Sequence, residues 1–126
     1  MLVLDAGGVS RLAEVSTRGV ALLRELRASG GLWPPVVPSI VIVESVTGTA
    51  RDARVNRLLT ACDVVTDLPE RVARRAGQLR ALARKGSAVD AVVVASAEPD
   101  GVVLTGDVED LTALATYAEG VVVMGA

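Results

Sequence analysis

Four carboxylates of this chain lie at the ends of apolar segments or inside them, where an ionised acid is costly. The four are Asp5 after LVL, Glu44 in IVIVES, Asp90 in AVDAVVVA and Asp107 after VVLTG. An unpaired carboxylate in such surroundings costs several kcal/mol, and acids gathered at one site also repel each other. A shared cation is therefore the first explanation to test.

These side chains offer only oxygen ligands, which suit Mg²⁺ or Mn²⁺. One or two such ions can activate a water molecule and stabilise the leaving oxygen in phosphodiester hydrolysis without histidine or cysteine. The chain contains no histidine and a single cysteine, Cys62. This excludes Ser-His-Asp and Cys-His catalysis, the usual Cys/His zinc sites and a disulfide within the monomer. Phosphodiester hydrolysis is the reaction that this inventory favours.

A sheet is needed to bring these acids together. Strand-like apolar runs occupy residues 2–5, 32–37, 62–66, 101–105 and 120–124, with helical patterns between them. This alternation predicts an α/β fold, a three-layer α/β/α sandwich with a central parallel sheet of four to five strands. The carboxyl ends of parallel strands meet at one rim, where ligands bind, so we expect Asp5 and Asp107 at that rim.

The element that carries Glu44 is left open by the pattern. The β-branched run IVIV favours a strand, whereas Pro38 and Ser39 just before it resemble a helix start. Helical patterns are clearer at 52–61, at 69–84, from Ser87 to Ala97 and at 107–117. Propensity alone does not decide whether Glu44 lies on a strand or on a helix.

Composition sets the broad class. A length of 126 residues with 51% apolar side chains predicts one domain, residues 1–126, with a buried core. The net charge of −2 argues against a strongly basic nucleic-acid binder, but the 13 basic residues lie mostly on predicted helices, so RNA is allowed. No apolar run reaches membrane length, and Met1 precedes the strand-like LVLD without signal-peptide features. We therefore expect a soluble, cytoplasmic protein with no membrane partner.

Each acid also has a purely structural interpretation. Asp5 can accept hydrogen bonds from turn amides, Asp107 can cap a helix, and Asp90 can lie in a first helical turn. Glu44 has fewer such uses, because apolar residues flank it. Arg51 and Arg54, three residues apart on one helix face, can contact RNA phosphates or simply form a solvated surface.

The order and spacing of these pieces resemble the PIN-domain ribonucleases, in particular the VapC-type toxins of type II toxin-antitoxin systems. The matching segments are LVLDAGGVSRL, PSIVIVESVTG and SAVDAVVVASAEPDGVVLTGDVEDL. Together they extend over nearly the whole chain.

The resemblance implies an Mg²⁺-dependent endoribonuclease, with Mn²⁺ as the alternative ion. Asp5, Asp90 and Asp107 would be metal ligands, and Glu44 would complete the catalytic quartet from a helix. Asp110 and Thr105 would be auxiliary residues. The resemblance also implies a homodimer, an RNA substrate and a cognate antitoxin, one segment of which packs in a groove and inhibits the site.

The chain departs from the family pattern at three positions. Gly7 stands where Ser or Thr is common, so a hydroxyl that would orient Asp5 or a metal-bound water is missing. Gly106 stands where a larger or basic residue is common, and Leu111 where an aromatic is common. These departures bear on rate and RNA preference more than on fold.

Other functions fit less well. LVLDAGGV and GDVED resemble motifs of haloacid-dehalogenase-like phosphatases, but Gly7 stands where their second aspartate should be. A response-regulator receiver has a similar size and an acidic pocket, but in this chain Asp5 has no acidic neighbour and no lysine follows a late strand. A catalytically silent PIN-like module that binds a protein partner is the non-enzymatic alternative.

Overall fold

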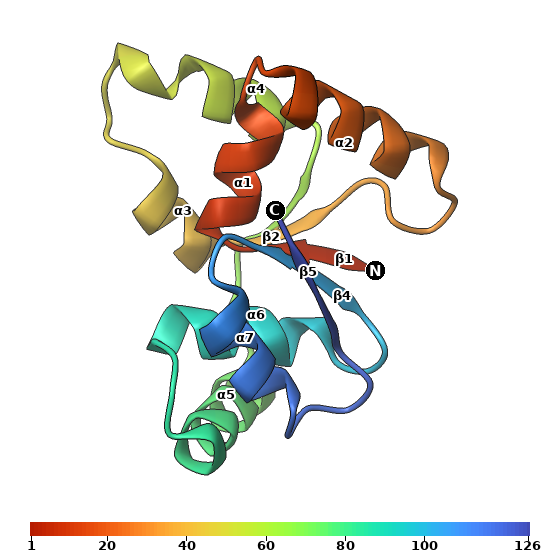
Figure 1. Cartoon of the computed structure of the whole chain (residues 1–126). Helices are drawn as coiled ribbons and strands as arrows, with labels where there is room; N and C mark the ends of the chain where they lie inside the picture. The colour runs from red at the N-terminus through yellow and green to blue at the C-terminus, as the bar shows by residue number, and fades with distance from the viewer.

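The computed structural model describes residues 1–126 and contains one five-stranded sheet in which all strands are parallel (Figure 1). Its strand order is β3-β2-β1-β4-β5. This confirms the predicted parallel sheet of four to five strands. The strands are β1 (Leu2–Leu4), β2 (Val36–Pro38), β3 (Asp63–Val65), β4 (Val102–Thr105) and β5 (Val122–Gly125).

Helices cover both faces of the sheet, which completes the predicted α/β/α sandwich (Figure 1). α1, α2 and α4 pack together on one face, and α5, α6 and α7 pack together on the other. No helix is both long enough and apolar enough to cross a membrane. The helices are α1 (Ala6–Ala13), α2 (Thr17–Ala28), α3 (Ser39–Ser45), the short 3₁₀ helix η1 (Ala50–Asp52), α4 (Ala53–Thr60), α5 (Glu70–Ala83), α6 (Ala88–Ala97) and α7 (Val108–Ala115).

The segment that the pattern left ambiguous is helical. The run IVIVES forms α3, which begins directly after Pro38, the last residue of β2. α3 contacts α1 on one face of the sheet and α6 on the other. Tertiary packing therefore overrides the strand preference of its β-branched residues. Glu44 lies in the last turn of this helix, on the element that the resemblance implied.

The predicted strand at 32–37 begins later than expected. β2 starts at Val36, immediately after Pro34 and Pro35, and lies between β3 and β1. A proline inside a central strand would remove a ladder hydrogen bond. The two prolines therefore mark the start of an interior strand and not a sheet edge.

The core is aliphatic and is centred on β1, β4 and α6. Leu2, Val3 and Leu4 are fully buried, and so are Val103 and Leu104 of β4. α6 buries every residue from position 91 to position 95, because it packs between its two neighbouring helices and the sheet. Such a helix is apolar on almost all sides, as expected for a buried element. Asp90 lies just ahead of this buried run, so its position is firmly held.

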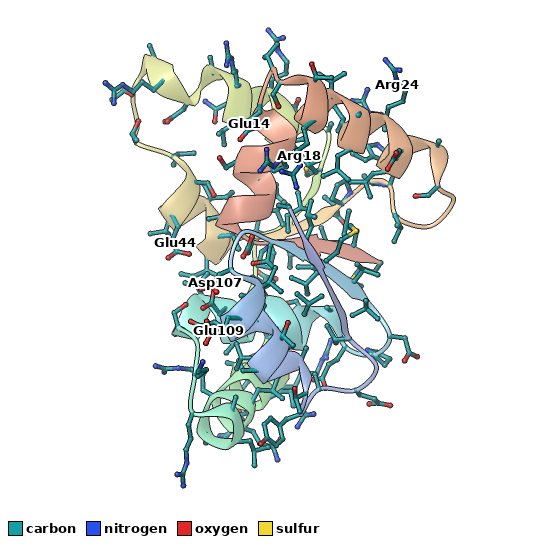
Figure 2. All side chains as sticks on the ribbon, in the orientation of Figure 1. Glu14, Arg18, Arg24, Glu44, Asp107 and Glu109 are labelled. Atoms are coloured by element: carbon teal, nitrogen blue, oxygen red, sulfur yellow. The ribbon has the colours of Figure 1, made fainter.

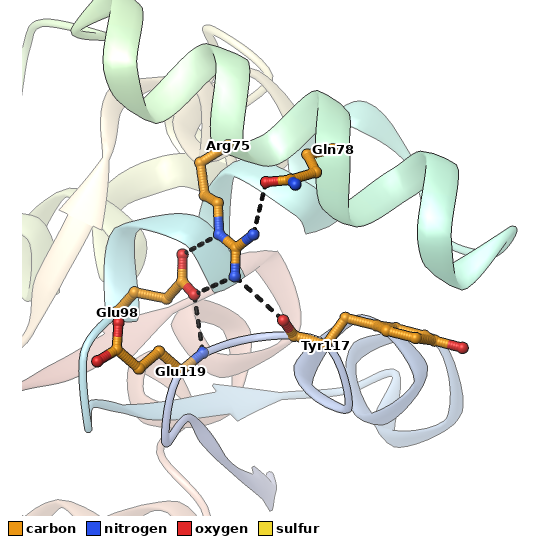
Figure 3. A network of polar contacts seen from close by, with 5 residues as sticks. All are labelled: Arg75, Gln78, Glu98, Tyr117 and Glu119. Carbon is orange, nitrogen blue, oxygen red and sulfur yellow. Dashed lines mark hydrogen bonds and ion pairs between the residues drawn. The ribbon is translucent and has the colours of Figure 1, made fainter.

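A polar network joins α5 to the loops that lead into β4 and β5 (Figure 3). Arg75 donates two hydrogen bonds of 2.8 Å to the carboxylate of Glu98, and it also donates to Gln78 Oε1 (2.6 Å) and to the Tyr117 carbonyl (3.1 Å). The Glu119 amide donates to Glu98 at 2.8 Å. The Arg75 guanidinium lowers the pKa of Glu98. This network therefore neutralises the carboxylate at the amino ends of these strands.

Candidate active site

The strand order reverses at β1. From β1 the chain builds outward through β2 and β3, and it then returns to place β4 and β5 on the other side of β1. α1 follows β1 on one face of the sheet and α7 follows β4 on the other face, so the chain diverges between the carboxyl ends of β1 and β4 (Figure 1). Ligands of open α/β sheets bind at such a switch point. Asp5 and Asp107 immediately precede these two helices.

Asp5 is a helix cap, and the residue is buried, with 6% of its surface exposed. Its Oδ1 accepts a hydrogen bond of 2.8 Å from the Gly8 amide, and its Oδ2 accepts one from the Thr105 hydroxyl. Burial raises the pKa of Asp5, and the charge of Asp90 raises it further, while the hydrogen bonds from Thr105 and Gly8 act in the opposite direction. The hydrogen bond from a turn amide, which the structural interpretation of Asp5 predicts, is thus present. Asp5 nevertheless lies close enough to Asp90 for the two carboxylates to repel each other.

Thr105 links the two strand ends. Its side chain is fully buried at the end of β4. The hydroxyl donates to Asp5 Oδ2 and accepts a hydrogen bond of 2.8 Å from the Asp107 amide. One hydroxyl therefore holds the buried acid and the start of α7 in fixed relation.

Asp90, Asp107 and Asp110 form the tightest group of acids. One carboxylate oxygen from each residue lies within 4.8 Å of the other two. Asp107 caps α7 by accepting from the Asp110 amide (3.2 Å), and Asp90 forms a capping box with Ser87 at the start of α6. The helix caps that the sequence suggested are therefore real, and they orient the three acids toward one another.

The negative charges of Asp90 and Asp107 influence the protonation of Asp110. Burial raises the pKa of Asp110, and the charges of Asp107 and Asp90 raise it further, while Lys85 lowers it. The ion pairs of the chain involve other acids: Glu14, Glu70, Glu98 and Glu109. Asp5, Asp90, Asp107 and Asp110 thus remain without an arginine or lysine partner. A donor set made only of oxygens, whose negative charge is not paired within the chain, fits a hard divalent cation such as Mg²⁺ or Mn²⁺.

Glu44 is not part of this group. Its side chain is exposed, forms no hydrogen bond or ion pair, and lies outside the set of three close carboxylates. Figure 2 shows Glu44 and Asp107 toward the same side of the molecule in this view. The structure brings together Asp90, Asp107 and Asp110, with Asp5 next to Asp90, and leaves the catalytic role of Glu44 a prediction.

The sequence offered Asp110 only as an auxiliary residue, and the structure brings it close to Asp90 and Asp107; its role stays a prediction. A signal was present in the spacing, because Asp107 and Asp110 are a helix cap and a residue three positions later, which the cap brings together. The inclusion of Asp110 with Asp90 depends on how α6 packs against α7. That packing could not be read from the sequence.

The structure explains two of the departures from the family pattern. A Cβ atom on Gly7 would lie 2.4 Å from the Gly106 amide nitrogen and 2.6 Å from its Cα. A Cβ on Gly106 would lie 3.2 Å from the Cα of Gly7. The two glycines therefore allow α1 to approach the end of β4, and a hydroxyl residue cannot simply be added at position 7. The hydroxyl that contacts Asp5 comes from Thr105 instead.

Arg51 and Arg54 lie on η1 and α4, which belong to the α1 face of the sheet. Both side chains are exposed, and Arg54 lines a groove of about 220 Å³ between α1, α2 and α4. Asp90, Asp107 and Asp110 belong to the α6 and α7 face. Contact of these two arginines with RNA phosphates stays a prediction.

Comparison with known proteins identifies the fold. No protein-family model and no curated protein sequence matches the chain. The crystal structure of PAE2754 from Pyrobaculum aerophilum is similar, with a TM-score of 0.63, 18% identity, and coverage of 97% of this chain and 89% of that one. The crystal structure of FitAcB from Neisseria gonorrhoeae is also similar, with a TM-score of 0.61, 21% identity, and coverage of 98% and 96%. These similarities concern the fold, which is PIN-like.

Proposed function

We propose that this chain is a divalent-metal-dependent endoribonuclease of the VapC type, the toxin of a toxin-antitoxin pair that acts in the cytoplasm. One observation carries the proposal. Acids at the end of β1 and at the starts of α6 and α7 lie close together at the switch point of the sheet, and none of them forms an ion pair with a basic residue. The PIN-like fold supports the same activity.

Asp5, Asp90 and Asp107 would hold Mg²⁺ or Mn²⁺, with Asp110 beside them. The bound ion would supply a Lewis acid and a water of lowered pKa. Thr105 keeps Asp5 and the start of α7 in place through its buried hydroxyl. α1 and α7 both begin at this rim, and helix N-termini favour a negatively charged phosphate group. Glu44 would face the substrate from α3.

We further propose that a cognate antitoxin docks in the groove between α1, α2 and α4. Apolar side chains including Leu12, Val20 and Leu23 line this groove together with Arg27 and Arg54. An amphipathic segment with acidic flanks fits such a surface. Loss of toxin inhibition on Leu23→Glu, with RNA cleavage retained, is the expected result.

A second copy of the chain is the other partner that we propose. Ile40 and Val43 of α3 and Val65 and Leu68 near β3 are exposed apolar residues. A hollow of about 240 Å³ lies among Ile40, Val65 and Leu68. Homodimerisation would cover this surface. Light scattering should give a dimer mass for the wild type and a monomer mass for Val43→Glu.

The test of the activity is cleavage of single-stranded RNA by purified protein free of antitoxin. With Mg²⁺ or Mn²⁺ we expect endonucleolytic fragments, with EDTA none, and with Asp5→Asn none. Asp63→Asn is the matched control, because Asp63 is an exposed acid at the start of β3. Intact RNA in the metal-loaded sample would favour a silent interaction module. Release of phosphate from a phosphomonoester, with phosphorylated Asp5 trapped, would favour a phosphatase.

A further inference from the structure

The carboxyl end of α5 and the turn into α6 form a hollow lined by basic side chains, called the basic hollow below. The hollow has a volume of about 440 Å³, and its walls are Gly77, Arg80, Ala81, Arg84, Lys85 and Gly86. Three of these residues are basic and none is acidic. In a chain of net charge −2, such a hollow is a local concentration of positive charge.

The basic hollow adjoins the candidate active site. A Cβ atom on Gly86 would lie 3.5 Å from the Cβ of Asp90, so the wall of the hollow contacts one of the clustered acids. Lys85 forms an ion pair with Glu109, and Asp110 and Asp107 help to raise the pKa of this lysine. Basic and acidic surfaces therefore meet along this edge of α6 and α7.

Two arginines of the hollow are available to an anion. Arg80 and Arg84 are exposed and form no ion pair, and the side chain of Arg80 donates only a long hydrogen bond of 3.4 Å to the Gly86 carbonyl. Arg74 and Arg75, one to two turns earlier on the same helix, are both paired with glutamates. Glu70 and Glu98 thus neutralise these two arginines, whereas Arg80 and Arg84 in the wall of the basic hollow stay without an acidic partner.

Arg84 also occupies a backbone position that favours glycine. It ends α5 in the left-handed region, with φ of 53°. Glycine or asparagine is the usual residue there, because a side chain with a Cβ is disfavoured at positive φ. A positive side chain at the carboxyl end of a helix is favourable for the helix dipole, and Arg84 has no ion-pair partner there, so it is free to bind an anion.

We propose that Arg80 and Arg84 bind phosphates of the RNA strand beside the bond that is cleaved, so that the strand enters over the turn between α5 and α6. This inference rests on the proposed ribonuclease function. Four unpaired carboxylates repel a polyanion, so a strand that reaches them needs cations close by. Guanidinium groups bind phosphate oxygens with paired hydrogen bonds, and few aromatic side chains are present to stack bases.

The test compares two pairs of substitutions that remove the same charge. Arg80→Gln with Arg84→Gln is compared with Arg18→Gln with Arg24→Gln, two exposed arginines of α2 on the α1 face that form no ion pair. Binding of a fluorescent single-stranded RNA is measured in EDTA over a range of salt concentrations. We expect the first pair to weaken binding about tenfold or more and to reduce the slope of log K against log salt by about 1.4, since each lost phosphate contributes about 0.7. The second pair should change neither quantity.

Binding in EDTA separates this inference from the proposed function. If the wild type binds RNA through Arg80 and Arg84 but does not cleave it with Mn²⁺, the ribonuclease proposal fails and the binding surface stands. If Arg80→Gln with Arg84→Gln binds and cleaves like the wild type, the inference is overturned and the ribonuclease proposal stands. Equal losses in the two pairs, or no RNA binding by the wild type, would also overturn it. Thermal melting of each variant checks that the fold is retained.

Discussion

Carboxylates at the two ends of the sheet differ in whether a basic residue pairs with them. At the amino ends of β4 and β5, Glu98 is paired with Arg75 and accepts a further backbone hydrogen bond. At the carboxyl ends of β1 and β4, Asp5 and Asp107 have no basic partner, and Asp90 adds to the negative charge. A chain that can neutralise an acid at one end leaves several unpaired at the other. The second set is therefore the one that could hold a cation from outside the chain.

The two ends also respond oppositely to pH. The pKa of Glu98 is lowered, so its contribution to stability is present above its ordinary pKa and is lost as pH falls through the lowered value. The pKa of Asp5 is raised, so the folded state binds its proton more tightly than the unfolded chain. Stability contributed by Asp5 is therefore lost as pH rises from its ordinary pKa through the raised value. Without metal, the ionised Asp5 carboxylate therefore opposes folding above its raised pKa.

The largest expected effect comes from removing one charge at the carboxyl end. Asp107→Asn should lower the rate of RNA cleavage about 10³-fold or more, because a metal ligand supports several kcal/mol of transition-state stabilisation. Asparagine caps a helix as well as aspartate does, so α7 should persist. Cleavage rates with saturating Mn²⁺ and circular dichroism are the measurements. Full activity in this variant would remove Asp107 from the site.

A smaller effect is expected when the amino end loses its cation. Arg75→Met should lower the free energy of unfolding by about 2 kcal/mol, because the Glu98 side chain, only 12% exposed, would keep its charge without its partner. Urea unfolding at neutral pH measures this change. RNA cleavage by the folded variant should not change, since the network lies away from the acids of the carboxyl end.

Arg74→Met is the matched control for that experiment. Arg74 also pairs with a glutamate, Glu70, but both side chains are about 80% exposed, so little stability should be lost.

The loss of stability between neutral pH and pH values below the ordinary pKa of Glu98 should be smaller in Arg75→Met than in the wild type. An equal acid-side loss in both proteins would show that the pair does not set this dependence.

The smallest expected effect tests the packing beneath the carboxyl end. Gly7→Ser should destabilise the fold by about 1.5 kcal/mol and slow cleavage, because its Cβ would meet the backbone of Gly106. Gly30→Ser is the control, since no atom lies within 4 Å of the added Cβ. Thermal melting and cleavage assays measure both variants. Faster cleavage by Gly7→Ser would instead support the interpretation that position 7 merely lacks a useful hydroxyl.

How far the sequence predicted this molecule depends on the range of the interactions. The strand after Met1 and the helix capped by Ser87 were predicted because local patterns and caps determine them. The residue pattern left the helix of Glu44 open and only the family resemblance implied it, because packing of α3 against α1 and α6 overrides its β-branched residues.

The site shows the same division. Asp5, Glu44, Asp90 and Asp107 were all selected from their positions beside or inside apolar segments, which local sequence reveals. That Glu44 lies outside the group of close carboxylates could not be read from these positions. The contact of Gly7 with Gly106 and the junction of the basic hollow with Asp90 were not predicted, because both join segments that are distant in the chain. Only the assembled fold brings these segments together.

The central claim is that the acids at the carboxyl ends of β1 and β4 hold a divalent ion, and titration of Mn²⁺ into metal-free protein tests it most directly. Calorimetry measures the binding, and thermal melting measures the gain in stability. We expect the wild type and Asp63→Asn to bind the ion and to gain about 2.7 kcal/mol of stability at a free concentration a hundredfold above Kd. Asp107→Asn and Asp110→Asn should bind far more weakly and gain little. Equal binding by the wild type and Asp107→Asn, or no binding by either, would contradict the account.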